Sequence, residues 1–73
     1  MTVSAIELVG GAIRTRRQAM GLSQDAFADT IDMHRAYYSA IERGEKNVTV
    51  ETLVRVATGL NATVAELASE AGI

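Results

Sequence analysis

The side chains best able to do chemistry gather in one short stretch near the middle of the chain. His34, Arg35, Tyr37, Ser39 and Arg43 offer hydrogen-bond donors and positive charge there. No nucleophile, base and orienting group can be assembled from the residues of this chain, and one histidine without any cysteine cannot build a metal site. We therefore predict no catalytic residue, no metal site and no cofactor.

The charge of the whole chain gives no support for a nucleic-acid partner. Seven Lys and Arg stand against nine Asp and Glu, for a net charge of −2. Six of the seven basic residues lie between positions 14 and 46, however, together with only five of the acids. A case for nucleic acid must therefore come from where the charges are placed.

Length and composition predict a single small domain over 1–73. Hydrophobic residues at 48% and charged residues at 22% are typical of a chain that folds in water. No apolar stretch is long enough to cross a bilayer, and no basic residue precedes the longest one as a signal peptide would require. We expect a cytoplasmic protein with no membrane partner.

The elements that position these side chains are predicted to be helices, because proline is absent, aromatics are few and no alternating pattern indicates a strand. Capping and periodicity place five helices over 5–20, 24–31, 35–43, 50–60 and from 64 onward, which predicts a compact all-α domain. The residues expected to start or end these helices are Ser4, Ser23, Thr49, Thr63, Gly21, Gly44 and Asn61. The stripes expected to be buried include Ile6, Val9, Ile13 and Met20 in the first helix, and Val50, Leu53, Ala57 and Leu60 in the fourth.

The helices over 24–31 and 35–43 have the dimensions of a helix-turn-helix spanning 24–43. Three residues separate them, and Ala28 is small enough for another helix to cross closely. Any helical hairpin in a small bundle could have this spacing. On spacing alone, a DNA-binding unit and a plain hairpin both remain open.

Three spaced motifs favour the DNA-binding interpretation. They are Ile13-Arg-Thr-Arg-Arg-Gln-Ala-Met-Gly-Leu-Ser-Gln24, then Phe27-Ala28, then Tyr38-Ser-Ala-Ile-Glu-Arg-Gly44. Together they resemble the Cro and phage-repressor-like helix-turn-helix family. The run from His34 to Thr49 is most similar to the controller proteins of restriction-modification systems, although short repressors and antitoxins share the same cassette. The resemblance implies a lambda-repressor-like fold that binds a double-stranded DNA operator as a homodimer.

The resemblance implies phosphate contacts at the start of the second helix. Gln24 is similar to the family residue that hydrogen-bonds a backbone phosphate, and Ser23 is expected to do likewise. The alternative is that Ser23 only caps the helix and that Gln24 is only solvated.

The resemblance makes the third helix the recognition helix. Arg35 is implied to donate a forked pair of hydrogen bonds to O6 and N7 of one guanine, and the alternative is a solvated arginine. Ala36 and Ala40 occupy neighbouring contact positions, where a methyl group touches thymine or permits a close approach. Tyr37 and Ser39 can reach phosphate or base edges.

Further contacts are implied at both ends of that helix. His34 is expected in its cap or first turn, facing solvent or a phosphate. Arg43, Lys46 and Asn47 flank Gly44, where the family turns amides and side chains toward phosphates. For Arg43 a second interpretation stays open, because a cation at a helix C-terminus is favourable without DNA.

One pair of charges is interpreted as architecture. Arg17 and Glu42 match the family positions that form an ion pair between the first and third helices.

The sequence departs from the family at two positions. Asp32 stands where the turn often has glycine, so a left-handed residue is expected there at some cost. Tyr38 replaces an aliphatic residue, and its hydroxyl needs a partner.

The last two helices carry more apolar residues than a small core needs, which predicts a two-fold contact centred on Val64 and Leu67. The alternative is that these residues cap the core of a monomer. A second hypothesis of a different class is an antitoxin-like or other protein-interaction module, with DNA binding secondary. A bound regulator would occlude or recruit RNA polymerase, and the sequence leaves open which.

Overall fold

Side-chain caps start four of the five helices in the computed structural model, which describes residues 2–73. Capping boxes open α1 (Ala5–Ala19) and α5 (Val64–Ala71): the Ser4 amide donates to Glu7 at 3.1 Å and the Thr63 amide to Glu66 at 2.9 Å. Ser23 caps α2 (Gln24–Thr30) and Thr49 caps α4 (Val50–Gly59). Only α3 (Arg35–Glu42) begins without a side-chain cap, at His34. The predicted helices and caps are confirmed, with boundaries shifted by about one residue.

Left-handed residues end the helices and set the turns. Gly21 and Gly44 have φ of +74° and +71°. Asp32, in the turn between α2 and α3, has φ of +52°, as its position in place of glycine predicts. Arg55 of α4 supports this turn, because its guanidinium donates to the carbonyl of Ile31 at 2.9 Å and also to that of Asp32. The sequence alone did not suggest this role for Arg55.

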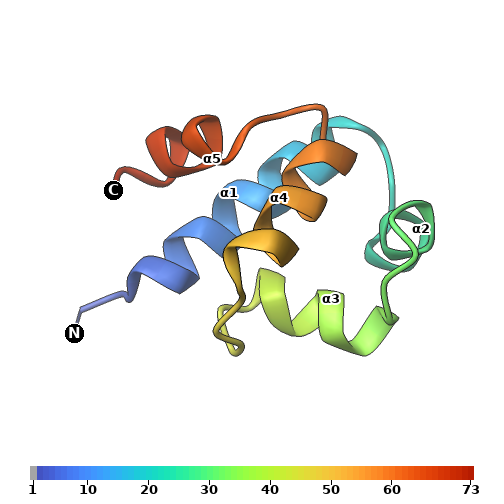
Figure 1. Cartoon of the computed structure of the whole chain (residues 1–73), viewed down its shortest axis with the longest axis horizontal. Coiled ribbons are helices and arrows are strands. Elements are labelled where there is room, and N and C mark those ends of the chain that lie inside the picture. The colour runs from blue at the N-terminus through green and yellow to red at the C-terminus, as the bar shows by residue number, and fades with distance from the viewer. Residues whose placement is uncertain (1) are drawn as a thin grey trace.

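The five helices share one hydrophobic core. In Figure 1, α1 runs through the molecule with α5 alongside it, and α2 and α3 form the opposite end. The largest fully buried side chains are Ile13, Phe27, Tyr38, Ile41, Val56 and Leu67. The rings of Phe27 and Tyr38 lie 5.1 Å apart between α2 and α3, in a tilted arrangement that favours aromatic contact.

α1 approaches the end of α3 closely because residue 10 is glycine. A Cβ atom at Gly10 would lie 2.5 Å from the carbonyl oxygen of Glu42, closer than such atoms can come. On its other side α1 meets α5, where Arg16 donates to Glu70 at 2.8 Å. α1 is therefore the element against which both α3 and α5 are placed.

Two residues predicted to be buried are exposed. Met20 lies just beyond α1 as its C-cap, so it no longer follows the periodicity of the helix, and it is 45% exposed. Val50 is the first residue of α4, where no other element covers it, and it is 74% exposed. No helix within residues 2–73 is long and apolar enough to cross a membrane.

Candidate nucleic-acid interface

The α2–α3 unit is anchored to α1 by a buried, two-pronged ion pair. Arg17 Nε donates to Glu42 Oε2 at 2.7 Å, and Arg17 Nη2 donates to Glu42 Oε1 at 3.0 Å. Both residues are buried, and the remaining Arg17 donor bonds the carbonyl of Leu22 at 2.8 Å. The predicted pair between the first and third helices is confirmed. Its fork fixes distance and orientation together.

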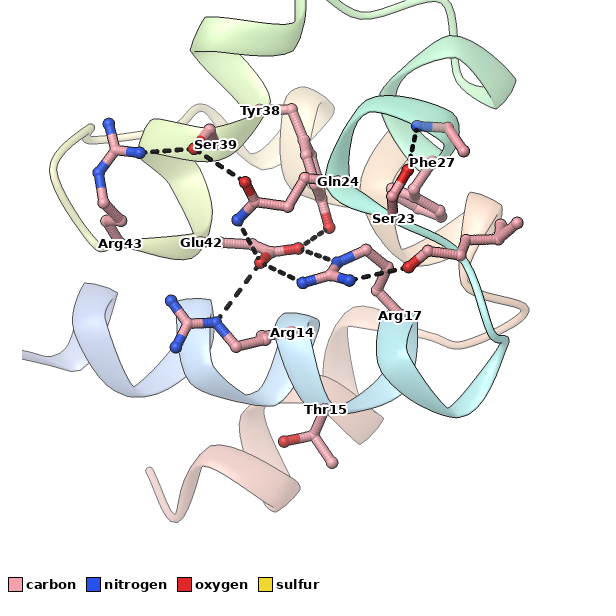
Figure 2. Close-up of polar contacts among 12 residues, drawn as sticks. Arg14, Thr15, Arg17, Ser23, Gln24, Phe27, Tyr38, Ser39, Glu42 and Arg43 are labelled. Carbon is pink, nitrogen blue, oxygen red and sulfur yellow. Dashed lines mark hydrogen bonds and ion pairs between the residues drawn. The ribbon is translucent and has the colours of Figure 1, made fainter.

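Glu42 accepts hydrogen bonds from α1, from α2 and from its own helix α3, as Figure 2 shows. The Tyr38 hydroxyl donates to Oε2, and Gln24 Nε2 donates to Oε1 at 2.9 Å. Arg14 Nε stands 3.5 Å from the same oxygen. The Tyr38 hydroxyl thus has the partner that its burial requires.

These bonds determine the charge state of the site. Burial by itself raises the pKa of the Glu42 carboxyl, but the hydrogen bonds from Arg17, Tyr38 and Gln24 outweigh it, so the pKa lies below its ordinary value. Burial and the bond to Glu42 raise the pKa of Tyr38. At neutral pH the centre is therefore a carboxylate held by a guanidinium and a neutral phenol.

A polar chain runs from this centre to the surface of α3. Ser39 Oγ donates to Gln24 Oε1 at 3.1 Å, and Arg43 Nη1 donates to Ser39 Oγ at 2.5 Å (Figure 2). The interpretation of Gln24 as merely solvated is therefore wrong, since its amide joins α2 to α3. Ser23 caps α2 by accepting from the Ala26 amide at 3.1 Å. Phosphate contacts by these residues stay predictions.

The first turn of α3 presents its side chains to solvent. His34, Arg35 and Ala36 are exposed, and Tyr37 is half-buried against the core. Arg35 is not simply solvated: its Nη2 donates to Asp29 at 2.8 Å, and its Nη1 stands 3.4 Å from Asp25. The bond to Arg35 lowers the pKa of the Asp29 carboxyl.

Ala40 needs a correction, because it is 5% exposed and cannot offer its methyl group to a base. Ala40 lies in the second turn of α3, where its neighbours Ile41 and Glu42 are buried as well, and the Glu45 amide donates to its carbonyl at 3.0 Å. Ala36, one helical turn earlier, stays at the surface. The candidate interface therefore uses only the first half of α3 for close approach.

The turn after α3 holds the remaining candidate phosphate contacts. Lys46 and Asn47 are exposed in it, and Arg43 is exposed at its start. Arg43 Nε donates to Glu45 at 2.9 Å, and this bond raises the pKa of Arg43. Arg43 therefore has a structural partner on each side, in Ser39 and Glu45.

The predicted dimer surface is corrected at Leu67, which is 0% exposed. Leu67 lies on the side of α5 that packs into the core, so it is not available to a second chain. Val64 is half-buried and lines a shallow groove of about 320 Å³ between α4 and α5. The groove residues are Val54, Ala57, Thr58, Ala62, Thr63 and Val64. Val54 of α4, which lines this groove, is 47% exposed.

Residues 13–73 match the profile of a protein family described as helix-turn-helix. The chain belongs to this helix-turn-helix family. It is 42% identical over 57 residues to the control protein C.MunI of a Mycoplasma species, with 78% of this chain and 77% of that protein covered.

Solved helix-turn-helix regulators share the whole fold. The clp gene regulator ClgR of Corynebacterium glutamicum is 32% identical and superposes with a TM-score of 0.93, covering 99% of this chain and 92% of its own. The restriction-modification controller protein C.Esp1396I was solved as a tetramer with its natural 35-base-pair operator. It is 25% identical to this chain and superposes with a TM-score of 0.82, covering 99% of this chain and 100% of its own.

The contacts of Arg35 with Asp25 and Asp29 in this helix-turn-helix were not predicted from the sequence. Asp25 and Asp29 are four residues apart, which places them on one face of α2. That spacing was the available signal, but the contact with Arg35 also depends on the angle at which α3 leaves the turn. Among the described residues, no cluster of three His, Asp or Glu side chains could hold a metal ion.

Proposed function

We propose that this chain is a sequence-specific DNA-binding transcriptional regulator, which binds a near-palindromic operator as a homodimer. The observation that carries the proposal is the exposed first turn of α3, a helix whose other end is anchored to α1 by the Arg17–Glu42 pair. A recognition helix enters the major groove with its N-terminal residues, while its later residues stay packed on the domain. The likeness to the control protein C.MunI favours a restriction-modification system as the setting.

Arg35 is the residue proposed to read sequence directly. Its planar fork can donate two hydrogen bonds to O6 and N7 of guanine, the commonest specific contact in the major groove. Ala36 beside it is exposed and lets the helix come close to the base edges. Tyr37 and Ser39 lie at the margin of this surface, where Ser39 already bonds Gln24.

Phosphate contacts are proposed on both sides of the recognition helix. Lys46, Asn47 and Arg43 follow it in one exposed turn, while Ser23 and Gln24 stand at the start of α2 and His34 at the start of α3. The chain has a net charge of −2, so its general attraction to DNA is weak. Placement of a few cations must therefore supply the electrostatic part of binding.

The apolar surface of α4 and α5 is proposed to form the dimer. One such domain buries only about 600 to 1,000 Å² on DNA, so useful specificity requires two copies on half-sites about 34 Å apart. Val54 and Val64 line the groove, and Val50, four residues before Val54 on α4, is exposed. A two-fold contact would remove these valines from water.

The same groove supports a second candidate function, that of an antitoxin-like protein-interaction module. Glu51 is exposed on α4, one of the two helices that border it, and would suit a basic partner. Glu66 and Glu70 of α5 are exposed too, but both already face Arg16 of α1. For the regulator, the proposed location is the cytoplasm and the further partner is RNA polymerase, which a bound dimer would occlude or recruit. No enzymatic step is proposed.

Binding to random-sequence duplex DNA over a range of salt concentrations tests the proposal. Fluorescence anisotropy should show log affinity falling linearly with log salt between about 50 and 200 mM, because phosphate contacts release counterions. Selection from a random DNA pool should then enrich a two-fold symmetric site. A flat or absent salt response would favour the protein-interaction module instead.

A further inference from the structure

The guanidinium group of Arg35 is already engaged on one edge before any DNA is bound. Nε donates to Asp29 Oδ1 at 3.3 Å and Nη2 donates to Asp29 Oδ2 at 2.8 Å, so the interaction with the carboxylate is bidentate. Asp25 makes a single longer contact with Nη1, at 3.4 Å. The Arg35 and Asp29 side chains are each 57% exposed.

Stability does not account for this arrangement. Exposed ion pairs contribute little to folding, because water already solvates both charges. On a surface that meets phosphates, the two carboxylates also repel the DNA backbone. Asp25 and Asp29 therefore oppose non-specific binding on the face that is proposed to bind.

An arginine can offer a pair of parallel donors along either of two edges of its guanidinium group. Asp29 holds the edge formed by Nε and Nη2, which leaves the end-on edge formed by Nη1 and Nη2 directed away from it. We propose that Asp29 is a positioning residue, which holds Arg35 so that its end-on edge donates to O6 and N7 of guanine. This inference rests on the proposed function, because it requires that the chain bind operator DNA.

The expected consequence is selectivity more than affinity. When Asp29 holds Arg35, the guanidinium group stays in the orientation that guanine requires. The adjacent carboxylate at the same time weakens the attraction of Arg35 to DNA phosphates. Asp25 differs, because it makes a single contact of 3.4 Å with Nη1 and so does not hold the fork of the guanidinium group. Asp29 is therefore expected to sharpen discrimination, and Asp25 to lower affinity for every DNA sequence equally.

The pair Asp29→Asn and Asp25→Asn tests this difference, since each removes one negative charge from the same face of α2. Affinities are measured for a duplex selected by the wild-type chain and for the same duplex with the base pair read by Arg35 replaced. Asp29→Asn should reduce the discrimination between them about three- to tenfold, a part of the effect of a complete bidentate contact. Asp25→Asn should tighten binding to both duplexes and leave their ratio unchanged. Asp29→Glu should restore part of the lost discrimination.

A measurement on the free protein makes the test independent of DNA. Rotation about the Arg35 guanidinium bonds, followed by NMR of its side-chain nitrogens, should be slow in wild type and in Asp25→Asn but fast in Asp29→Asn. Equal rotation in all three proteins, or unchanged discrimination in Asp29→Asn, would overturn the positioning role. Tighter operator binding by Asp29→Asn with full discrimination would also overturn it, because Asp29 would then only compete with the base. Failure of wild type to discriminate any sequence would instead refute the proposed function itself.

Discussion

The hydroxyl of Tyr38 donates a hydrogen bond to the carboxylate of Glu42, one helical turn further along α3. Tyr38 is fully buried against Phe27, and Glu42 is at the same time the partner of Arg17 in α1. The Tyr38–Glu42 hydrogen bond therefore connects the aromatic part of the core to the Arg17–Glu42 ion pair. The resemblance predicts an aliphatic side chain at this position, and the tyrosine that stands there adds a donor to the central carboxylate.

Tyr38→Phe should lower the free energy of unfolding by about 1.5 to 3 kcal/mol, the usual contribution of a hydrogen bond to a charged group. The ring stays in place, so packing on Phe27 is retained. Urea denaturation measures the loss. Tyr37→Phe is the matched control, because Tyr37 is only half-buried, and it should change stability by less than about 0.5 kcal/mol. Equal losses in the two variants would mean that the Tyr38 hydroxyl is not the relevant group.

Arg17→Ala and Glu42→Ala should each destabilise the fold by about 3 to 5 kcal/mol, because each leaves its buried partner uncompensated. The double variant should lose less than the sum, since the second change removes the stranded charge. Glu42→Ala should be the more damaging single change, as it also leaves the Tyr38 hydroxyl and the Gln24 amide without their acceptor. Additive losses in a double-mutant cycle would contradict the pairing.

The free energy of unfolding should decrease at acidic pH, and part of this decrease should come from protonation of Glu42. The pKa of Glu42 in the folded protein lies below the ordinary pKa of a carboxyl group. The stabilisation from Glu42 is therefore complete at pH values above the ordinary pKa, and it is lost as the pH falls through the pKa of the folded protein. Glu42→Gln should therefore flatten the acid limb of a plot of unfolding free energy against pH. The pKa of Glu70 is also lowered by Arg16, but this pair is exposed, so Glu70→Gln should change the curve far less.

Arg35→Ala and Lys46→Ala should weaken DNA binding in different ways. Arg35→Ala should cost about 5- to 150-fold on the selected site and relax the preference at one base pair in each half-site. Lys46→Ala should weaken all sequences about equally and reduce the salt slope by about one per protomer. An equal, sequence-independent loss from both changes would contradict base recognition by Arg35.

Val64→Glu and Val54→Glu should shift a dimer toward monomer, because each places a charge in the groove between α4 and α5. Cooperative binding to a two-half-site operator should be lost, while weak binding to a single half-site remains at low salt. Leu67→Glu is the contrasting variant and should unfold the domain, because Leu67 is fully buried. Sedimentation of a monomeric wild type at tens of micromolar, with and without DNA, would refute the dimer.

The sequence by itself determined the five helices, their caps and the left-handed residues that end them. Ser4 with Glu7, Thr63 with Glu66, and Asp32 all behave as predicted, because each signal acts between groups a few residues apart. The Arg17–Glu42 pair followed from the resemblance to a family whose helices cross in the same way. These features needed no knowledge of packing beyond that family.

Only the tertiary structure decided which side of each helix is covered and which charges meet. Leu67 and Val64 lie on one helix and looked equivalent by hydropathy, but the contact of α5 with α1 buries one and leaves the other at a groove. Ala40 of α3 was expected to be exposed and is buried, whereas Val50 at the start of α4 was expected to be buried and is exposed. Asp29 reaches Arg35 only because α2 and α3 meet at the angle set by the turn at Asp32. Periodicity specifies a helix and its apolar stripe, whereas burial and side-chain pairing depend on how helices cross, and that is a property of the whole core.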